Sequence, residues 1–400
     1  MNEIGETMRP ELRFPEFKDE WIEKAFGDFT KTNQGLQIAI SNRETQYKEG
    51  YYFYITNEFL KPNSKIKYYI KNPPNSVIAN KDDILMTRTG NTGKVITGVH
   101  GAFHNNFFKI KFDNEQYDRL FIYELLKSSK INNKILSLAG TSTIPDLNHS
   151  DFYSIKSFIP KYEEQQKLGI FFSKLDHQIE LEEKKLELLE QQKKGYIQKT
   201  FSQELRFKDD NGNDYPDWSI KKIEDISKVN KGFTPNTKND EYWDELNENW
   251  LSIAGMTQKY LYKGNKGITE KGASKHIKVD KDTLIMSFKL TLGKLAIVKE
   301  PIYTNEAICH FVWKDSNVNT EYMYYYLNSI NISTFGAQAV KGVTLNNDSI
   351  NSIIVKLPVI QEQNKIAYFF NELDKLIRKQ YAKIEVLKQR KKGLLQKMFI

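Results

Sequence analysis

The sequence predicts an α+β protein in which two similar domains are joined by two long antiparallel helices that pair within one chain as a coiled coil. Three observations support this prediction. Residues 160–201 recur at 358–399, each copy has the apolar spacing of a long helix, and the segments before the two copies also match. Because the repeat occurs only twice, the chain is a duplication and not a solenoid. The two halves are expected to be related by approximate two-fold symmetry.

Both repeated stretches are predicted to be helices of about 40 residues, roughly 60 Å long. Their apolar residues follow one another at alternating steps of three and four, which is the seam of a coiled coil. Glu182 and Lys193 in the first copy, and Gln380 and Lys391 in the second, are polar seam residues that cost stability and fix register. The predicted apolar seam comprises Phe172, Leu175, Ile179, Leu186, Leu189, Tyr196, Phe370, Leu373, Ile377, Ile384, Leu387 and Leu394.

A helix with so narrow an apolar face needs a partner helix. Because both helices belong to one chain, the nearest partner of each is the other. An ordinary coiled coil between two chains is the alternative. The same seam in two copies within one chain favours the intramolecular pair.

The duplication extends beyond the helices. Glu-Leu-Arg-Phe at 11–14 recurs at 204–207, directly after the first helix. Because this sequence also opens the chain, the N-terminal segment is expected to pack near the end of the second helix. The predicted divisions are an N-terminal segment (1–20), a first domain (21–158), a first long helix (159–203), a second domain (204–356) and a second long helix (357–400).

Within each domain, short β-branched runs predict strands and one segment has helical spacing. The halves differ most at 36–80 and 233–276, where basic and aromatic residues alternate. That composition suits a nucleic acid; strand packing with surface lysines is the alternative. Strands are predicted at 76–79, 93–97 and 353–357, and helices at 116–129 and 319–329.

Composition narrows the class of protein. A chain of 400 residues predicts two or three domains. A net charge of +8 permits a polyanionic partner without proving one. Cys309 is the only cysteine, so a reducing compartment fits. With neither a signal peptide nor a membrane-spanning run in the sequence, a cytoplasmic protein is expected.

Motifs that would carry catalysis are incomplete. Residues 72–75 resemble the Asn-Pro-Pro-aromatic motif of amino-methyltransferases, but Asn75 replaces the aromatic residue, which favours a plain turn. Residues 90–94 have the wrong spacing for a phosphate loop, and a β-hairpin turn is favoured. The histidines lack zinc-site spacing, and Cys309-His310 is expected in the core. No catalytic or metal-binding residue is therefore assigned.

Several motifs together resemble the specificity subunit of type I restriction–modification enzymes, over essentially the full length of the chain. They include Ile-Leu-Met … Gly-Lys at 84–94, its counterpart Leu-Ile-Met … Gly-Lys at 284–294, and the repeated Pro-x-x-x-Glu-Gln-x-Lys before each long helix. Gly232-Phe233-Thr234-Pro235 is followed by Tyr242-Trp243 and Trp250-Leu251-Ser252. The first half departs from this pattern, because Gly35 is followed by Leu36 and Gln37.

The resemblance implies a non-catalytic subunit with two target-recognition domains, each recognising one half of a split double-stranded DNA site. It implies that the long helices act as a spacer and as a docking surface for two methylation subunits. Those subunits would bind S-adenosylmethionine, and restriction subunits would use ATP and Mg. No cofactor is expected on this chain.

DNA-binding residues are predicted in two polar loops of each domain, one after an apolar strand and one before the final strand. Arg is the usual reader of guanine, and Lys more often contacts phosphate. A purely structural role in turns is the alternative for each residue. The predicted residues are Arg88, Asn91, Lys94, Thr141, Ser142, Thr143, Lys289, Thr291, Lys294, Gln338 and Lys341.

Two other function classes stay open from the sequence. A coiled-coil scaffold without DNA specificity would show DNA binding that is insensitive to salt, since phosphate contacts release counterions. An enzyme with its own methyltransferase or nuclease site would act as an isolated chain, but the missing motifs argue against it.

Overall fold

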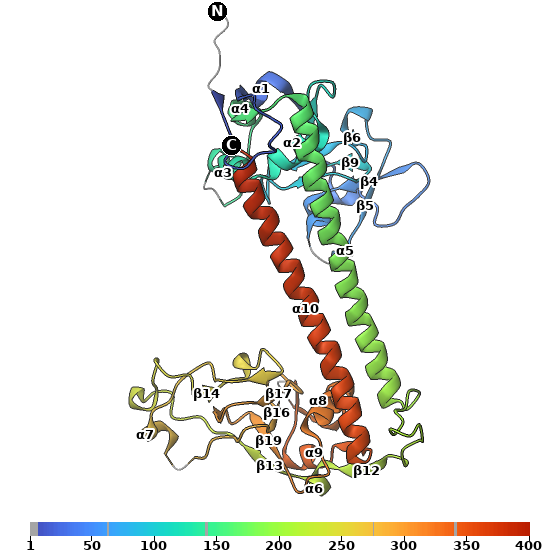
Figure 1. The fold of residues 1–400 in the computed structure, drawn as a ribbon, viewed down its shortest axis with the longest axis vertical. Helices are drawn as coiled ribbons and strands as arrows, with labels where there is room; N and C mark the ends of the chain where they lie inside the picture. Colours follow the sequence, from blue (N-terminus) through green and yellow to red (C-terminus); the bar gives the residue numbers. More distant parts are fainter. Residues whose placement is uncertain (1–6, 62–63, 141–142, 275, 340–341) are drawn as a thin grey trace, which may run out of the picture. The chain divides into compact units, whose positions relative to one another are not determined.

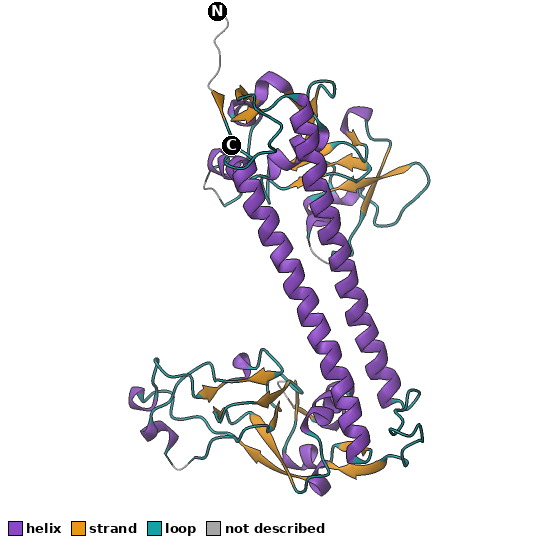
Figure 2. Ribbon diagram, viewed as in Figure 1, coloured by secondary structure: helices purple, strands orange, loops and turns teal. Residues whose placement is uncertain are grey.

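The computed structural model describes residues 7–61, 64–140, 143–274, 276–339 and 342–400. The chain forms two compact units, shown in Figure 1. Unit 1 comprises Met1–Lys184 and Ala382–Ile400, and unit 2 comprises Lys185–Tyr381. Each long helix therefore contributes one half to each unit. Helices and strands are mixed in both units (Figure 2), which confirms the α+β prediction. None of the described helices is long and apolar enough to cross a membrane.

Unit 1 is built on a four-stranded antiparallel sheet of order β3-β10-β7-β8. A second sheet, β5-β4-β9-β6, and a third, β1-β2-β11, complete it. Met86 and Phe108 pair across the first sheet and are fully buried against the helices. The elements before the long helix are β1 (Thr7–Met8), β2 (Trp21–Ala25), α1 (Phe26–Phe29), β3 (Thr30–Gln34), η1 (Ile40–Asn42), β4 (Tyr51–Ile55), η2 (Asn57–Leu60), β5 (Tyr68–Lys71), η3 (Asn75–Val77), β6 (Ile78–Ala79), β7 (Ile84–Thr87), β8 (Val95–Ile96), β9 (Gly101–Phe103), β10 (Phe107–Phe112), α2 (Arg119–Lys127), α3 (Ser129–Leu138), α4 (His149–Ser154) and β11 (Lys156–Ile159).

Unit 2 repeats the first of these sheets as β13-β19-β16-β17 and adds β15 parallel to β17. Met286 and Cys309 pair at the position of Met86 and Phe108 and are likewise fully buried. The elements are β12 (Ser219–Lys222), α6 (Ile223–Ile226), β13 (Ser227–Lys231), η4 (Asp240–Tyr242), β14 (Trp250–Leu251), η5 (Ile253–Gly255), β15 (Tyr260–Leu261), α7 (Glu270–Ala273), β16 (Leu284–Ser287), β17 (Leu295–Val298), β18 (Tyr303–Thr304), β19 (Ile308–Trp313), α8 (Thr320–Ser329), η6 (Ile332–Phe335), β20 (Ala337–Ala339), β21 (Gly342–Thr344), α9 (Asn347–Asn351) and β22 (Ile354–Leu357).

Local predictions were confirmed in part. The strand predicted at 353–357 is β22 and the helix predicted at 319–329 is α8, whereas only Val95 and Ile96 of the strand predicted at 93–97 are extended, as β8. The strand predicted over 76–79 was confirmed only in its second half. Residues 75–77 form a 3-10 turn after Pro74, and only Ile78 and Ala79 are extended. The helix predicted to end at 129 gives way to α3, which begins there because the Ser128 side chain accepts the Ile131 N–H.

The two long helices are α5 (Tyr162–Phe201) and α10 (Ile360–Met398). Within unit 1, the Phe172 ring lies 5.6 Å from that of Phe399, near the opposite ends of the two helices. Within unit 2, the Tyr196 ring meets that of Phe369 edge-on at 5.3 Å. The helix halves thus run antiparallel in each unit, which confirms the intramolecular pair. All predicted seam residues are buried or half-buried except Tyr196, which is 38% exposed.

One buried carboxylate near the start of each long helix ties that helix to the segment carrying Glu-Leu-Arg-Phe. Because an arginine and a tryptophan share each carboxylate, the bond explains why these sequences recur together. The N-terminal segment also contacts α10, since the Leu12 N–H donates to the Lys397 carbonyl. The contacts are Arg13 Nε–Glu164 Oε1 2.7 Å, Trp21 Nε1–Glu164 Oε2 3.1 Å, Arg206 Nε–Glu362 Oε1 3.0 Å and Trp218 Nε1–Glu362 Oε2 3.0 Å.

Candidate nucleic-acid interface

The turn over residues 88–94 connects β7 and β8 in unit 1 and is the β-hairpin turn that the sequence predicted. Gly90, Asn91 and Gly93 all have positive φ, of 62°, 54° and 83°. Glycine and asparagine adopt this conformation at little cost, which accounts for the local sequence. The Thr87 hydroxyl donates to the Asn91 carbonyl at 2.5 Å and closes the turn.

A second predicted loop lies against this turn. The Arg88 guanidinium donates to the Leu147 carbonyl at 3.0 Å and pairs with the Asp146 carboxylate at 2.8 Å. The Thr92 hydroxyl donates to the Pro145 carbonyl at 2.9 Å. The structure therefore brings together residues 88–94 and 143–147, which are distant in sequence.

A third segment, η2, completes the arrangement. The Asn57 side-chain amide donates to the carbonyls of Thr89 and Gly90, at 2.9 and 3.1 Å. The Lys94 ammonium donates to the Leu60 carbonyl at 3.2 Å. Residues 57–60, 88–94 and 143–147 are called the unit 1 turn cluster below. Sequence reasoning missed Asn57, whose only signal was its place in the divergent window 36–80.

The predicted residues of unit 1 differ in how free their side chains are. Asn91 and Thr143 are exposed. Arg88 and Lys94 are already bound to protein oxygens, so they hold the cluster together in the free protein. Thr141 and Ser142 lie outside the described residues. The DNA-binding assignments of all six stay predictions.

In unit 2 the equivalent turn connects β16 and β17. Phe288 stands where unit 1 has Arg88 and is fully buried, yet its carbonyl accepts the Leu345 N–H as that of Arg88 accepts the Leu147 N–H. The Lys294 ammonium donates to the Ile253 carbonyl at 3.3 Å, so it too is partly structural. Lys289 and Thr291 are exposed, Gln338 lies on β20, and Lys341 is outside the described residues.

One face of β4 and β5 adds aromatic and basic groups beside the unit 1 turn cluster. Phe53 pairs with Tyr69 across the two strands, and its ring lies 5.5 Å from that of Phe59 on η2. Lys67 and Lys71 alternate with Tyr69 along this face, and both lysines are exposed. Aromatic residues beside exposed cations suit a nucleic-acid backbone and its bases.

The cavities and titratable groups offer little for catalysis. A cavity of about 460 Å³ in unit 2 is lined by Phe233, His276, Thr304 and His310. Burial lowers the pKa of His310 to about 4, so the ring is neutral near pH 7. Its Nε2 atom lies 2.5 Å from the Thr304 hydroxyl. Burial also raises the pKa of the Cys309 thiol to about 12, so it is no nucleophile. Among the described residues, no group of three His, Cys, Asp or Glu side chains is placed to hold a metal ion.

Comparison with known proteins gives a consistent result. The profile of the family described as "Type I restriction modification DNA specificity domain" matches twice, at residues 18–191 and 215–389. The type I restriction enzyme MjaVIII specificity subunit of Methanocaldococcus jannaschii is 25% identical, over 96% of this chain and 93% of its own length. The MjaIX specificity subunit of the same organism is 31% identical, over 50% of this chain and 48% of its own length.

Solved structures share the fold. The crystal structure of the S subunit of a type I restriction–modification system from M. genitalium superposes with a TM-score of 0.59 at 16% identity, covering 98% of this chain and 99% of its own. A chain from a study of assembly and conformational transition of the type I R-M system gives 0.60 at 14% identity, covering 94% and 97%.

Proposed function

Because the chain belongs to the type I restriction–modification DNA specificity family, we propose that each of its two units recognises one half of a split DNA target. The chain is a specificity subunit, which supplies DNA recognition and is not itself an enzyme. One observation carries the division into half-sites. The sheet β3-β10-β7-β8 recurs as β13-β19-β16-β17. The turn from β7 to β8 and its counterpart from β16 to β17 nevertheless present different side chains.

The unit 1 turn cluster and the turn between β16 and β17 of unit 2 are the proposed DNA-contacting surfaces. In unit 1, the exposed Asn91 and Thr143 are placed to meet bases or phosphates, and Lys67 and Lys71 to meet phosphates. In unit 2, Lys289 and Thr291 take the corresponding place. To contact a guanine, the Arg88 guanidinium must break its ion pair with Asp146. The guanine edge has two acceptors, which would favour this exchange.

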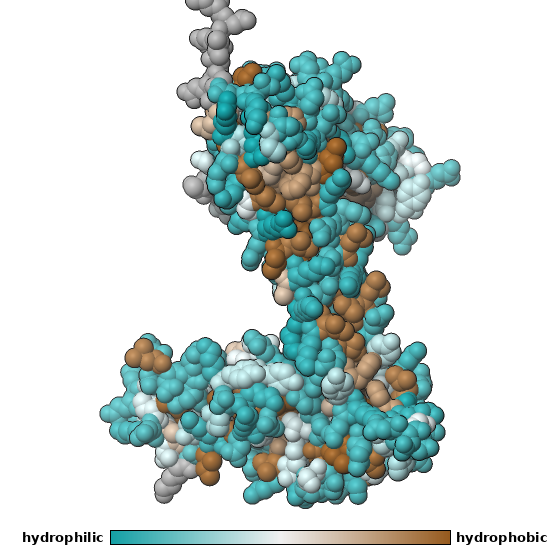
Figure 3. Space-filling view, in the orientation of Figure 1, coloured by the Kyte–Doolittle hydropathy of each residue, from teal (hydrophilic) through white to brown (hydrophobic). Residues whose placement is uncertain are grey.

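The long helices are the proposed docking surfaces for two methylation subunits. Apolar side chains reach the surface over the long helices (Figure 3), and both helices carry exposed apolar residues. Leu188 and Val386 occupy equivalent positions of the repeat and are 58% and 61% exposed; Ile170 and Tyr368, also equivalent, are 49% and 67% exposed. Exposed apolar residues at repeated positions fit two copies of one partner.

The remaining components are assigned to the partners. Methylation subunits would bring S-adenosylmethionine, and restriction subunits, joined through the complex, would bring ATP and Mg. A chain that acts on chromosomal DNA together with them would work in the cytoplasm.

An exchange of one domain tests the half-site proposal. Residues 21–155 are replaced by those of another family member, and methylated adenines are mapped in cells that express the complete system. We expect one half of the methylated motif to change while the other half and the spacer stay. The reciprocal exchange of residues 219–357 is the control and should change only the other half. A change in both halves from either exchange would contradict independent recognition.

A further inference from the structure

Each unit contains a cluster of buried and half-buried charges where a domain meets the paired helices: the Asp176 side chain is 39% exposed, and those of Lys193 and Asp374 are 24% and 15% exposed. In unit 1, the Lys391 ammonium of α10 pairs with Asp176 of α5 at 2.5 Å and with Glu124 of α2 at 2.9 Å. Lys127 of α2 bonds the same two carboxylates, at 3.1 and 3.2 Å. The Lys391 and Glu124 side chains are 8% and 2% exposed. These four residues are called the unit 1 ion cluster.

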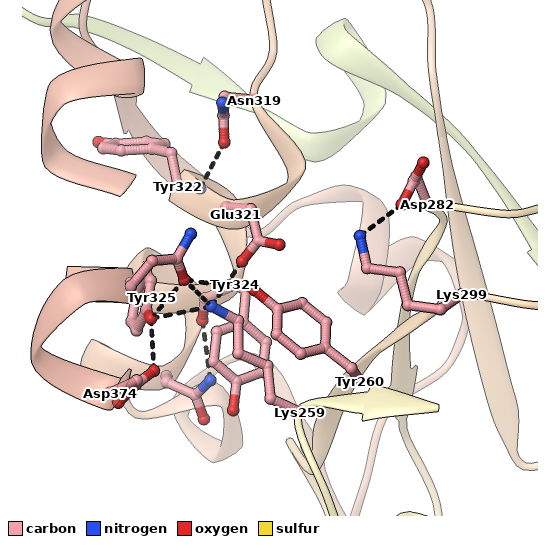
Figure 4. A network of polar contacts seen from close by, with 12 residues as sticks. Lys259, Tyr260, Asp282, Lys299, Asn319, Glu321, Tyr322, Tyr324, Tyr325 and Asp374 are labelled. Atoms are coloured by element: carbon pink, nitrogen blue, oxygen red, sulfur yellow. Dashed lines mark hydrogen bonds and ion pairs between the residues drawn. The ribbon is translucent and has the colours of Figure 1, made fainter. Parts of the chain in front are cut away.

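The unit 2 ion cluster, part of which Figure 4 shows, has the same centre and different surroundings. Lys193 of α5 pairs with Asp374 of α10 at 2.5 Å. Asp374 also accepts the Tyr325 hydroxyl at 2.5 Å, from α8. On the other side of that phenol, Lys259 donates to the Tyr325 oxygen at 2.8 Å and pairs with Glu321 at 2.5 Å.

The two central ion pairs are equivalent in the repeat. Asp176 and Asp374 are 198 positions apart, as are Lys193 and Lys391. Each helix thus contributes one aspartate and one lysine to the two pairs, with the lysine 17 positions after the aspartate. In an antiparallel pair, both aspartates meet both lysines in one register only. A slip of one heptad would separate each pair by about 10 Å.

The apolar seam residues discriminate weakly between registers, because the leucine, isoleucine and phenylalanine side chains of successive heptads can replace one another in the contact. The ion pairs can select one register, because a buried charge that loses its partner costs free energy, whereas one apolar contact can replace another. Burial raises the pKa of Glu124 and lowers the pKa of Lys391, which shows that desolvation opposes the charged forms. Such a cluster adds little stability in the correct register and removes stability from every other one.

We propose that the Asp176–Lys391 and Lys193–Asp374 pairs are positioning residues that fix the register of α5 against α10, and that their domain-side partners seat each domain on its own part of the helix pair. The domain-side partners differ, with a carboxylate and an ammonium from α2 in unit 1, and a phenol and a β15-flanking lysine in unit 2. Because of this difference, the helix surface that each domain contacts is distinct, although the two helices are alike. If the proposed function holds, the same residues also fix the spacer between the half-sites.

The test replaces both pairs by apolar residues of similar size, Asp176→Leu with Lys391→Met and Lys193→Met with Asp374→Leu, in the full-length chain. The register is read by disulfide formation. Glu183→Cys with Lys388→Cys reports the register of the structure, in which these side chains meet at 2.7 Å. Glu183→Cys with Leu395→Cys reports a slip of one heptad. The matched control removes two exposed pairs within the helices, by Glu180→Gln with Lys184→Met and Glu372→Gln with Lys375→Met.

We expect the wild-type and control chains to form only the first disulfide. We expect the apolar variant to keep or raise its melting temperature and to form both disulfides in comparable amounts. A purely structural role for the pairs would instead lower the melting temperature and leave the disulfide pattern unchanged. An apolar variant that forms only the first disulfide would overturn the proposal.

A second readout separates this proposal from the proposed function. Duplexes carrying the mapped target with its own spacer, or with the spacer changed by three base pairs, are bound by the same chains. A loss of at least tenfold in spacer discrimination by the apolar variant alone supports the proposal. If the wild-type chain binds no split target, the proposed function fails, and the disulfide pattern still decides whether the pairs fix the register.

Discussion

Asn91 is the residue at which a direct DNA contact is most cleanly separated from a structural role. Its side chain is exposed and its backbone has a φ of 54°, which glycine adopts freely. We expect Asn91→Gly to leave the melting temperature unchanged and to weaken binding to the target by about tenfold, the loss of one good base contact. Binding to target and scrambled duplexes at one fixed salt concentration measures this.

Arg88 supplies the contrast. Its guanidinium is bound to the Asp146 carboxylate and the Leu147 carbonyl. Arg88→Ala should therefore lower the melting temperature of unit 1 as well as the affinity for DNA. Equal losses on target and scrambled DNA would remove either residue from the set of base readers.

The sequence could place both residues in a polar turn. It could not show that one is exposed and the other bound, because Asp146 and Leu147 come from a loop far away in the chain.

Among the elements, the long helices were the most predictable from sequence, and the reason is their periodicity. A seam such as that from Phe172 to Leu189 repeats locally and depends on no distant contact. The second sheet of unit 1 was not predictable, because β4 pairs with β5 nearby but also with β9, about fifty residues on. The ion clusters were visible only as polar residues in the seam, whose partners on α2 and α8 had no sequence signal.

The anchor at the start of each long helix gives a prediction at this scale. The Glu362 side chain has no exposed surface and accepts bonds from Arg206 and Trp218. We expect Glu362→Gln to destabilise unit 2 by about 3 kcal/mol, since it leaves the arginine without its buried counter-charge. Thermal melting measures the loss. The exposed Glu372→Gln on the same helix is the control and should change stability by less than about 0.5 kcal/mol. Equal effects would show that burial of the carboxylate is irrelevant.

For the whole molecule, the duplication itself leads to a prediction about the spacer. Both helices pass from one unit into the other. The first long helix leaves unit 1 after Lys184, and the second leaves unit 2 after Tyr381. Inserting one heptad after each of these residues keeps the seam in phase and adds about 10 Å to each helix. Because double-stranded DNA rises about 3.4 Å per base pair, we expect the mapped target to keep both half-sites and to lengthen its spacer by about 3 base pairs.

The phase of the seam provides the control for that experiment. Inserting two residues at the same two points instead turns the following apolar residues by about 200°, away from their partners. It should therefore lower the melting temperature and abolish methylation of the split target, whereas the heptad insertion should preserve both. A heptad variant that methylates the original spacer would show that the length of the helices does not determine the distance between the half-sites.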